Sequence, residues 1–156
     1  MSRLSDRLIQ DMIDHNISYE LIYHDEIWTI EDGKKKSNIP VDKILKTLAF
    51  NVDNRYIFAV LQGNRQVNYS KLASALNSSR KSISRLPAEI LENELGYEIG
   101  GVSPLHIDSR IETVFDSHVT NLYEVYCSVG TRNMTLKINI EDLLFLSHAR
   151  IYNISK

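Results

Sequence analysis

Apolar positions recur with helical spacing near the start of the chain. Leu4, Leu8 and Met12 are each four residues apart, so residues 3–15 are expected to form an amphipathic helix that packs by one face. Capping and helix-initiating residues predict the remaining helices. These are a short helix after Ser37 or Asn38 with Pro40 and Asp42 in its first turn, Tyr69–Leu76 after Asn68, Ala88–Leu95 after Pro87, and Glu141–Ser147 after Asn139.

Dense apolar runs predict the strands. Thr47–Val52 and Tyr56–Leu61 are separated by Asp53-Asn54-Arg55, whose turn chemistry indicates a β-hairpin. Further strands are expected at Tyr19–Tyr23, Ile111–Phe115, Leu122–Ser128, Met134–Ile140 and Ala149–Ile154. The irregular order of helices and strands favours an α/β (α+β) fold over a doubly wound sheet. We expect one domain over residues 1–156, with a mixed, curved, barrel-like sheet flanked by short helices.

Composition narrows the class of protein. The 156 residues are 43% hydrophobic and 24% charged, which is ordinary for a globular protein. No apolar run is long enough to span a bilayer and no signal-peptide core is present, so a cytoplasmic protein is expected. The single cysteine, Cys127, excludes an intramolecular disulfide. The five histidines lack metal-ligand spacing, so neither a metal nor a cofactor is expected.

Charge is distributed unevenly along the chain. The net charge is −2, but no acidic residue occurs between Asp53 and Glu89. The basic residues of that stretch are Arg55, Arg65, Lys71, Arg80, Lys81 and Arg85. Phosphate contacts need positive charge locally, so this stretch suits a nucleic-acid partner, although a solvated surface would have the same composition.

Glycine is concentrated in residues 96–104, which contain three of the six glycines. Gly96 stands where a left-handed residue would end the preceding helix. The Gly100-Gly101 pair could present two main-chain N–H groups to an anion, since no side chain shields them. An ordinary surface turn is the alternative.

Lys46 is the most informative charged side chain. Strand alternation places it on the same face as Leu48 and Phe50, so its ammonium either snorkels to solvent or serves a pocket. By the same alternation Cys127 is expected to be a buried apolar residue rather than a nucleophile.

Four segments in this order resemble the YbaK/ProX family of aminoacyl-tRNA deacylases, which is related to the editing domain of bacterial prolyl-tRNA synthetases. They are Lys46-Thr47-Leu48, residues 63–67 (GNRQV), residues 96–104 (GYEIGGVSP) and residues 126–132 (YCSVGTR). The resemblance covers about residues 15–154. It implies an enzyme that hydrolyses the ester between a wrong, small amino acid, cysteine or alanine, and the acceptor end of a tRNA, most simply tRNA(Pro).

The resemblance also implies that Lys46 is the key functional residue. We further expect Lys46 to hold the terminal ribose or phosphate, and N–H groups near Gly100 and Gly101 or near Ser128 and Gly130 to stabilise the oxyanion. The substrate pocket would be formed by Gly96, Ile99, Val102, Ser103, Pro104, Ser128, Gly130 and Arg132. The tRNA would be gripped by Arg65, Lys71, Arg80 and Lys81. Water, or the thiol of a cysteinyl substrate, would attack the ester.

Three alternatives stay open on the sequence. The first is a different editing substrate, since the sequence does not choose between alanine and cysteine. The second is a non-catalytic RNA-binding module, because Val129 replaces the first glycine of the family's usual pair. The third is a module that associates with prolyl-tRNA synthetase and binds no RNA itself.

Overall fold

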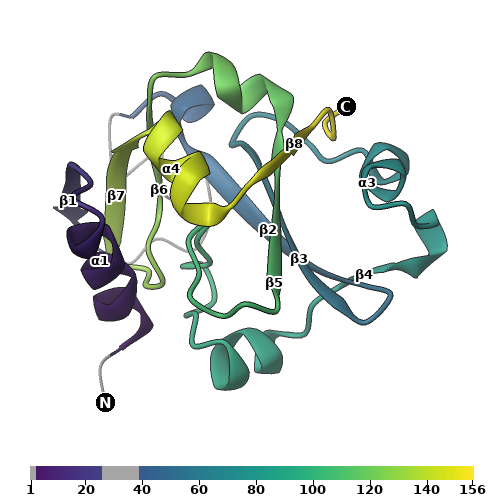
Figure 1. Cartoon of the computed structure of the whole chain (residues 1–156), viewed down its shortest axis with the longest axis horizontal. Helices are drawn as coiled ribbons and strands as arrows, with labels where there is room; N and C mark the ends of the chain where they lie inside the picture. The colour runs from purple at the N-terminus through teal and green to yellow at the C-terminus, as the bar shows by residue number, and fades with distance from the viewer. Residues whose placement is uncertain (1–2, 26–38) are drawn as a thin grey trace.

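The computed structural model describes residues 3–25 and 39–156, which form two β-sheets with helices around them (Figure 1). The larger sheet is built on the predicted hairpin, in which Asp53 and Asn54 both have positive φ, as a two-residue turn of this kind requires. Its strand order is β4-β2-β3-β5-β8, with β3/β5 and β5/β8 parallel and the other pairs antiparallel. The bounds are β2 Leu45–Val52, β3 Arg55–Gln62, β4 Ile83–Arg85, β5 Ile111–Asp116 and β8 Arg150–Tyr152.

The smaller sheet is antiparallel, in the order β1-β7-β6. Its strands are β1 Tyr19–Tyr23, β6 Glu124–Ser128 and β7 Met134–Asn139. An isolated parallel bridge between Ile44 and Tyr126 connects the start of β2 to β6. The two sheets therefore meet at the beginning of β2 and diverge from there.

In the described residues, three α-helices flank the sheets: α1 Leu4–Asp14, α3 Tyr69–Ala75 and α4 Ile140–Ser147. Two have the predicted caps, since Asn68 accepts a hydrogen bond from the Lys71 N–H and Asn139 accepts one from the Glu141 N–H. Short helical turns are η1 Val41–Lys43, η2 Arg80–Ser82, η3 Ile90–Glu94 and η4 Ser117–Asn121. In Figure 1, α1 lies at one end of the molecule beside β7 and α3 lies at the opposite end.

The larger sheet separates two hydrophobic cores. Leu45, Ala49 and Phe58 face the core shared with the smaller sheet, α1 and α4. Phe50, Ile57 and other residues of opposite parity face a second core closed by Leu72 and Leu76 around α3. Alternation along β2 and β3 therefore supplies apolar side chains to both faces of the sheet.

The expected fold class is confirmed, and the described strands form a sheet divided into two parts that does not close into a barrel. The strand β4 was missed, and the segment after Pro87 winds partly as a π-helix. The helix expected near Pro40 is a single 3-10 turn with Pro40 before it, while the proposed caps Ser37 and Asn38 lie outside the described residues. The last strand is shorter than expected, because only Arg150–Tyr152 pairs with β5.

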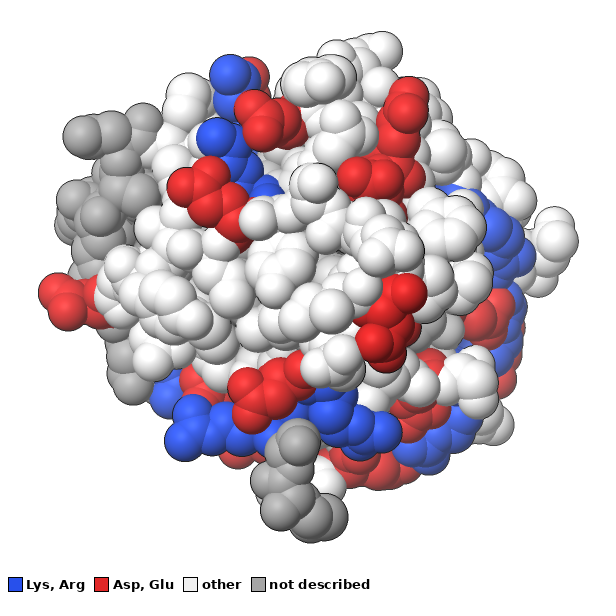
Figure 2. Space-filling model, turned by 60° about the vertical axis from the view of Figure 1, so that its left-hand side comes forward, with Lys and Arg blue, Asp and Glu red and all other residues white. Residues whose placement is uncertain are grey.

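Figure 2 shows one face of the molecule, on which uncharged residues occupy the centre and acidic and basic side chains are mixed along the margins. Within the described ranges, no helix is both long and apolar enough to cross a membrane.

Candidate functional site

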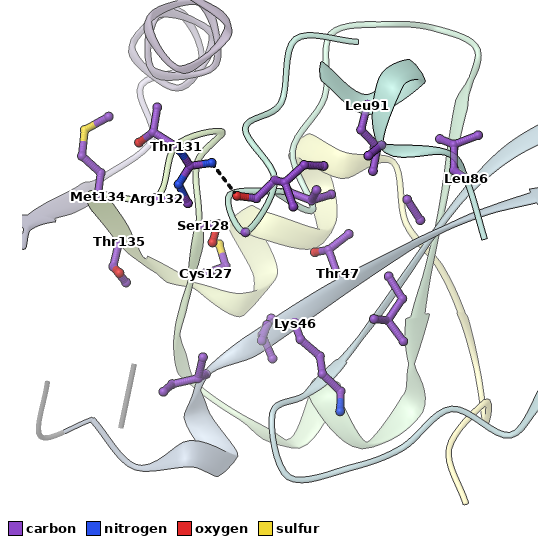
Figure 3. Close-up of a pocket in the computed structure, with 18 of the residues that line it drawn as sticks. Lys46, Thr47, Leu86, Leu91, Cys127, Ser128, Thr131, Arg132, Met134 and Thr135 are labelled. Carbon is purple, nitrogen blue, oxygen red and sulfur yellow. Dashed lines mark hydrogen bonds between the residues drawn. The ribbon is translucent and has the colours of Figure 1, made fainter. Parts of the chain in front are cut away.

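A pocket of about 670 Å³ lies beside the edge of β2, where the two sheets diverge (Figure 3). All five residues from Leu45 to Ala49 contribute to it. The opposite wall comes from the loop after η3 and from the turn between β6 and β7. Apolar lining comes from Leu86, Leu91, Ile99, Val102 and Met134, among others. Segments far apart in the sequence thus form one site.

The two glycine segments pack backbone against backbone to form that wall. The Gly130 N–H donates to the Gly101 carbonyl (2.9 Å), and the Glu98 N–H donates to the Gly130 carbonyl (3.0 Å). A Cβ on Gly101 would lie 2.7 Å from the main-chain N and C atoms of Thr131, closer than real contacts allow. Gly101 is therefore required for the close approach of the two segments.

Two of the N–H groups expected to stabilise an oxyanion, those of Gly101 and Gly130, already donate hydrogen bonds within the protein. The Gly101 N–H donates to the Glu98 carbonyl (2.8 Å), and the Gly130 N–H is engaged as described above. Both groups are occupied within the protein, so neither is available to a substrate in this conformation. Gly100, with φ of 88°, does line the pocket.

Lys46 lines the pocket from β2. Its side chain shares a face of the strand with Leu48 and extends away from Thr47 (Figure 3). Partial burial lowers the pKa of its ammonium below the usual value. Within the part of the chain that the structure describes, no group accepts a hydrogen bond from the Lys46 ammonium and no carboxylate pairs with it.

The charge around the pocket is positive. Lys46, Arg85 and Arg132 line it, and its described lining contains no aspartate or glutamate. Arg132 is fixed by the wall, because its Nη1 donates to the Ile99 carbonyl (2.8 Å) and its main-chain N–H to Glu98 Oε1 (2.9 Å). The site therefore suits a ligand with an apolar part and an anionic part.

Several neutral polar groups complete the lining. Thr47 Oγ1 and Thr131 Oγ1 are buried without a hydrogen-bond partner in the described structure. The His24 ring contacts the Asp25 carbonyl through Nδ1 (2.6 Å) and Thr135 Oγ1 through Nε2 (2.7 Å). Since a carbonyl only accepts, neutral His24 carries its proton on Nδ1 and accepts from Thr135 through Nε2.

Cys127 lines the pocket but is not an activated thiol. It is 2% exposed, and burial raises its pKa to about 12, so the thiol stays protonated at neutral pH. The expectation of a buried, apolar cysteine is met. The pocket thus holds no activated protein nucleophile at this position.

The structure brings together some of the predicted site residues and not others. Those that line the pocket are Lys46, Ile99, Gly100, Val102, Ser128 and Arg132. Those that do not are Gly96, Gly101, Ser103, Pro104 and Gly130, which shape or support the wall instead. Ser103, for example, is fully buried and accepts a hydrogen bond from the Leu105 N–H.

The four predicted tRNA contacts lie away from the pocket lining. Arg65 donates to Gln62 Oε1, and Lys71 donates to the Ser155 carbonyl (2.9 Å). Arg80 stacks over Tyr69, and both Arg80 and Lys81 are exposed on η2, directly before β4. Their role in binding stays a prediction.

Sequence reasoning missed Thr47, Arg85, Thr131 and His24 as pocket residues. Thr47 adjoins Lys46 in the quoted motif, so that motif was the available signal for it. Arg85 is brought in by its pairing with Phe50 across β2 and β4, which no local pattern indicated. Among the described residues, no group of three histidine, cysteine or acidic side chains is arranged to hold a metal ion.

Fold and site together define a small mixed α/β domain built around a pocket for a partly apolar, partly anionic ligand. The family model described as "Aminoacyl-tRNA editing domain" matches residues 24–146. The chain belongs to this family, which confirms the family resemblance seen in the sequence.

The relatives that match this chain include proteins of similar length and much longer ones. The EbsC protein of Enterococcus faecalis, described as a candidate Cys-tRNA(Pro)/Cys-tRNA(Cys) deacylase, is 27% identical over 139 residues, covering 88% of this chain and 83% of EbsC. The proline–tRNA ligase of Lactobacillus helveticus is 28% identical over 102 residues, covering 65% of this chain but only 18% of the ligase. The chain thus spans about a fifth of the ligases it matches.

A solved structure shares the fold over the whole chain. The crystal structure of a candidate trans-editing enzyme for prolyl tRNA synthetase matches with a TM-score of 0.79, covering 100% of this chain and 99% of that one. At 17% sequence identity the match concerns the fold alone.

Proposed function

We propose that this protein removes a small amino acid, cysteine or alanine, from mischarged tRNA(Pro), acting as a separate protein that cooperates with prolyl-tRNA synthetase in the cytoplasm. The observation that carries the proposal is that Lys46, Gly100 and Arg132 meet around a partly apolar pocket. The names of EbsC and of the proline–tRNA ligases support the choice of tRNA and of cysteine.

The pocket suits both parts of this substrate. Leu86, Leu91, Ile99 and Val102 offer an apolar surface to a short side chain, while Lys46 is free to contact a ribose or phosphate oxygen of the terminal adenosine. Gly101 keeps the loop after η3 in contact with the turn after β6, which fixes the shape of the wall against which the amino acid would lie.

Hydrolysis requires little from the protein beyond positioning. The oxygen of a water molecule bonds to the ester carbonyl carbon, the bond from that carbon to the ribose oxygen breaks, and a proton from water ends on the ribose oxygen. The products are the free amino acid and an unesterified tRNA. Because an aminoacyl ester is already activated, orientation and stabilisation of the oxyanion are the main tasks.

A deacylation panel tests the proposal. Cysteinyl- and alanyl-tRNA(Pro) should be hydrolysed, whereas prolyl-tRNA(Pro) should be spared, and cysteinyl-tRNA(Cys) reports the dependence on tRNA. Lys46→Ala should lower kcat/KM by about tenfold or more, as expected for loss of a charge-assisted hydrogen bond. Lys46→Arg, which keeps the charge, serves as the matched control.

Three results would count against the proposal. Full activity of Lys46→Ala would remove Lys46 from the site. Salt-sensitive RNA binding without turnover of any mischarged tRNA would favour the non-catalytic alternative. Binding to prolyl-tRNA synthetase without RNA binding would favour the third alternative.

A further inference from the structure

Among the strands that the structure describes, none pairs with the edge of β2 inside the pocket. On that side β2 is bridged to β6 at Ile44, and its ladder with β4 begins only at Phe50. The stretch between these two points, residues 45–49, forms the floor of the pocket. An unpaired strand edge within a binding site is a template for an extended ligand.

The direction of the main chain follows from two hydrogen bonds. The Ile44 carbonyl accepts from the Gly63 N–H (2.7 Å) on the β3 side, whereas the Ala49 carbonyl accepts from the Leu86 N–H (3.0 Å) on the opposite side. Main-chain groups alternate in direction along a strand, so Thr47, two residues before Ala49, directs its N–H and carbonyl away from β3, toward the open edge.

The side chain of Thr47 adds a third group. Its Oγ1 is buried and has no hydrogen-bond partner in the described structure, a state that costs stability. In Figure 3 this side chain points away from Lys46 and toward the glycine-rich wall. Thr47 thus combines an unpaired hydroxyl with a main chain that faces the open edge of β2.

From this arrangement we infer that Thr47 positions the aminoacyl group of the substrate. The ester carbonyl accepts a hydrogen bond from the Thr47 N–H, and the α-amino group donates to the Thr47 carbonyl and Oγ1. A residue at a strand edge and an amino acid can exchange two such bonds in the manner of an antiparallel pair. The described pocket lining offers no carboxylate to an amino group, so neutral oxygens must accept its hydrogen bonds.

The role of Thr47 rests on the proposed function and bears on the mechanism of hydrolysis. The carbonyl held by the Thr47 N–H is the one that water attacks, so this N–H would stabilise the oxyanion that forms. The Thr47 N–H would therefore serve in place of the Gly101 and Gly130 N–H groups, which donate to carbonyl groups within the wall.

The test is a double-mutant cycle between the Thr47 hydroxyl and the substrate amino group. Thr47→Val removes the hydroxyl and keeps the shape, and propionyl-tRNA(Pro) is alanyl-tRNA(Pro) without its amino group. If cysteine is the amino acid removed, cysteinyl- and 3-mercaptopropionyl-tRNA(Pro) form the equivalent pair. Thr47→Val should lower kcat/KM about tenfold on the aminoacyl substrate and change it little on the deaminated one.

Thr113→Val is the matched control. Thr113 Oγ1 is also buried without a described partner, but Thr113 lies on β5 and does not line the pocket. Both valine variants should melt at or above the wild-type temperature, since each removes an unpaired hydroxyl, yet only Thr47→Val should lose activity. Thr47→Ser, which restores the hydroxyl, should recover most of it.

Equal effects of Thr47→Val on both substrates, or no effect on either, would overturn the assignment. The same holds if the coupling to the amino group appears for Thr131→Val instead, because Thr131 Oγ1 is also buried in the pocket without a described partner. A wild-type protein that hydrolyses no aminoacyl-tRNA would instead overturn the proposed function, and the inference with it.

Discussion

Lys46 carries a positive charge where water solvates it only in part. Its pKa is lowered by burial, so the ammonium loses its proton at a lower pH than an exposed lysine does. Below that pKa the charged form costs folding free energy, and stability rises as the pH passes upward through it. A side chain that destabilises the free protein in this way is explained if the charge is used in binding.

The first prediction concerns the pH dependence of substrate affinity. A non-hydrolysable alanyl-tRNA(Pro) analogue with an amide in place of the ester should bind progressively more weakly as the pH rises from neutrality toward the ordinary lysine pKa of 10.5, because burial makes Lys46 lose its charge below that value. Lys46→Arg should bind the analogue with little change over that range, since arginine stays charged. Titration at constant ionic strength measures both. A decrease of equal size in Lys46→Arg would show that another group titrates.

At the scale of elements, the wall of the pocket depends on contact between two turns. Gly101 touches the main chain of Thr131, and Arg132 is bound to the carbonyl of Ile99. Backbone atoms cannot move aside as the end of a flexible side chain can. A substitution at Gly101 must therefore separate the turns.

Gly101→Ala tests this dependence. The added Cβ should lower stability by about 1–3 kcal/mol and reduce deacylation by about tenfold or more, because the wall shifts. Gly130→Ala is the comparison: φ at Gly130 is 99°, but an added Cβ would find its nearest neighbour at 3.5 Å, so strain of about 1–2 kcal/mol and a smaller loss of activity are expected. Thermal melting and deacylation assays measure the two effects. Wild-type activity in Gly101→Ala would contradict the role of the contact.

Most elements were predictable because their signals are local. The Leu4–Leu8–Met12 spacing defines α1, and the caps Asn68 and Asn139 define the starts of α3 and α4. The strand Ile83–Arg85 has only three residues and forms because β2 offers it a partner. Its sequence contains no pattern of its own, so pairing at a distance decided its structure.

The site was predictable only where family motifs marked it. Lys46 and Gly100 stood within such motifs and do line the pocket. The open edge of β2 could not be foreseen, because it depends on where the ladder with β4 ends. Likewise, the hydrogen bonds that occupy the Gly101 and Gly130 N–H groups arise from contact between the two turns, which are far apart in the sequence.

At the scale of the whole molecule, five basic residues of the stretch between Asp53 and Glu89 divide into two groups. Arg85 lines the pocket on β4, and Arg80 and Lys81 are exposed on η2 directly before it. Arg65 and Lys71 are half-buried and donate to the chain itself. We expect the tRNA backbone to run from the pocket along β4 toward η2.

Charge removal tests this path. The double variant Arg80→Gln/Lys81→Gln should weaken tRNA binding and lower the slope of log K against log salt by about 1–2, as expected when one or two phosphate contacts are lost. Lys71→Gln is the matched single change and should have a smaller effect, because the Lys71 ammonium is held by the Ser155 carbonyl. Affinity measured at several salt concentrations gives both slopes. A larger effect of Lys71→Gln would place the tRNA against α3 instead.

The open edge of β2 also bears on how the protein behaves at high concentration. Unpaired strand edges are where folded chains join one another into aggregates, and proteins usually protect them with charge, proline or a covering segment. Here the edge is the floor of a pocket, and the glycine-rich wall stands over it. The wall that admits one short extended ligand therefore also excludes a second protein strand, so a loosened wall would expose the chain to self-association as well as to loss of activity.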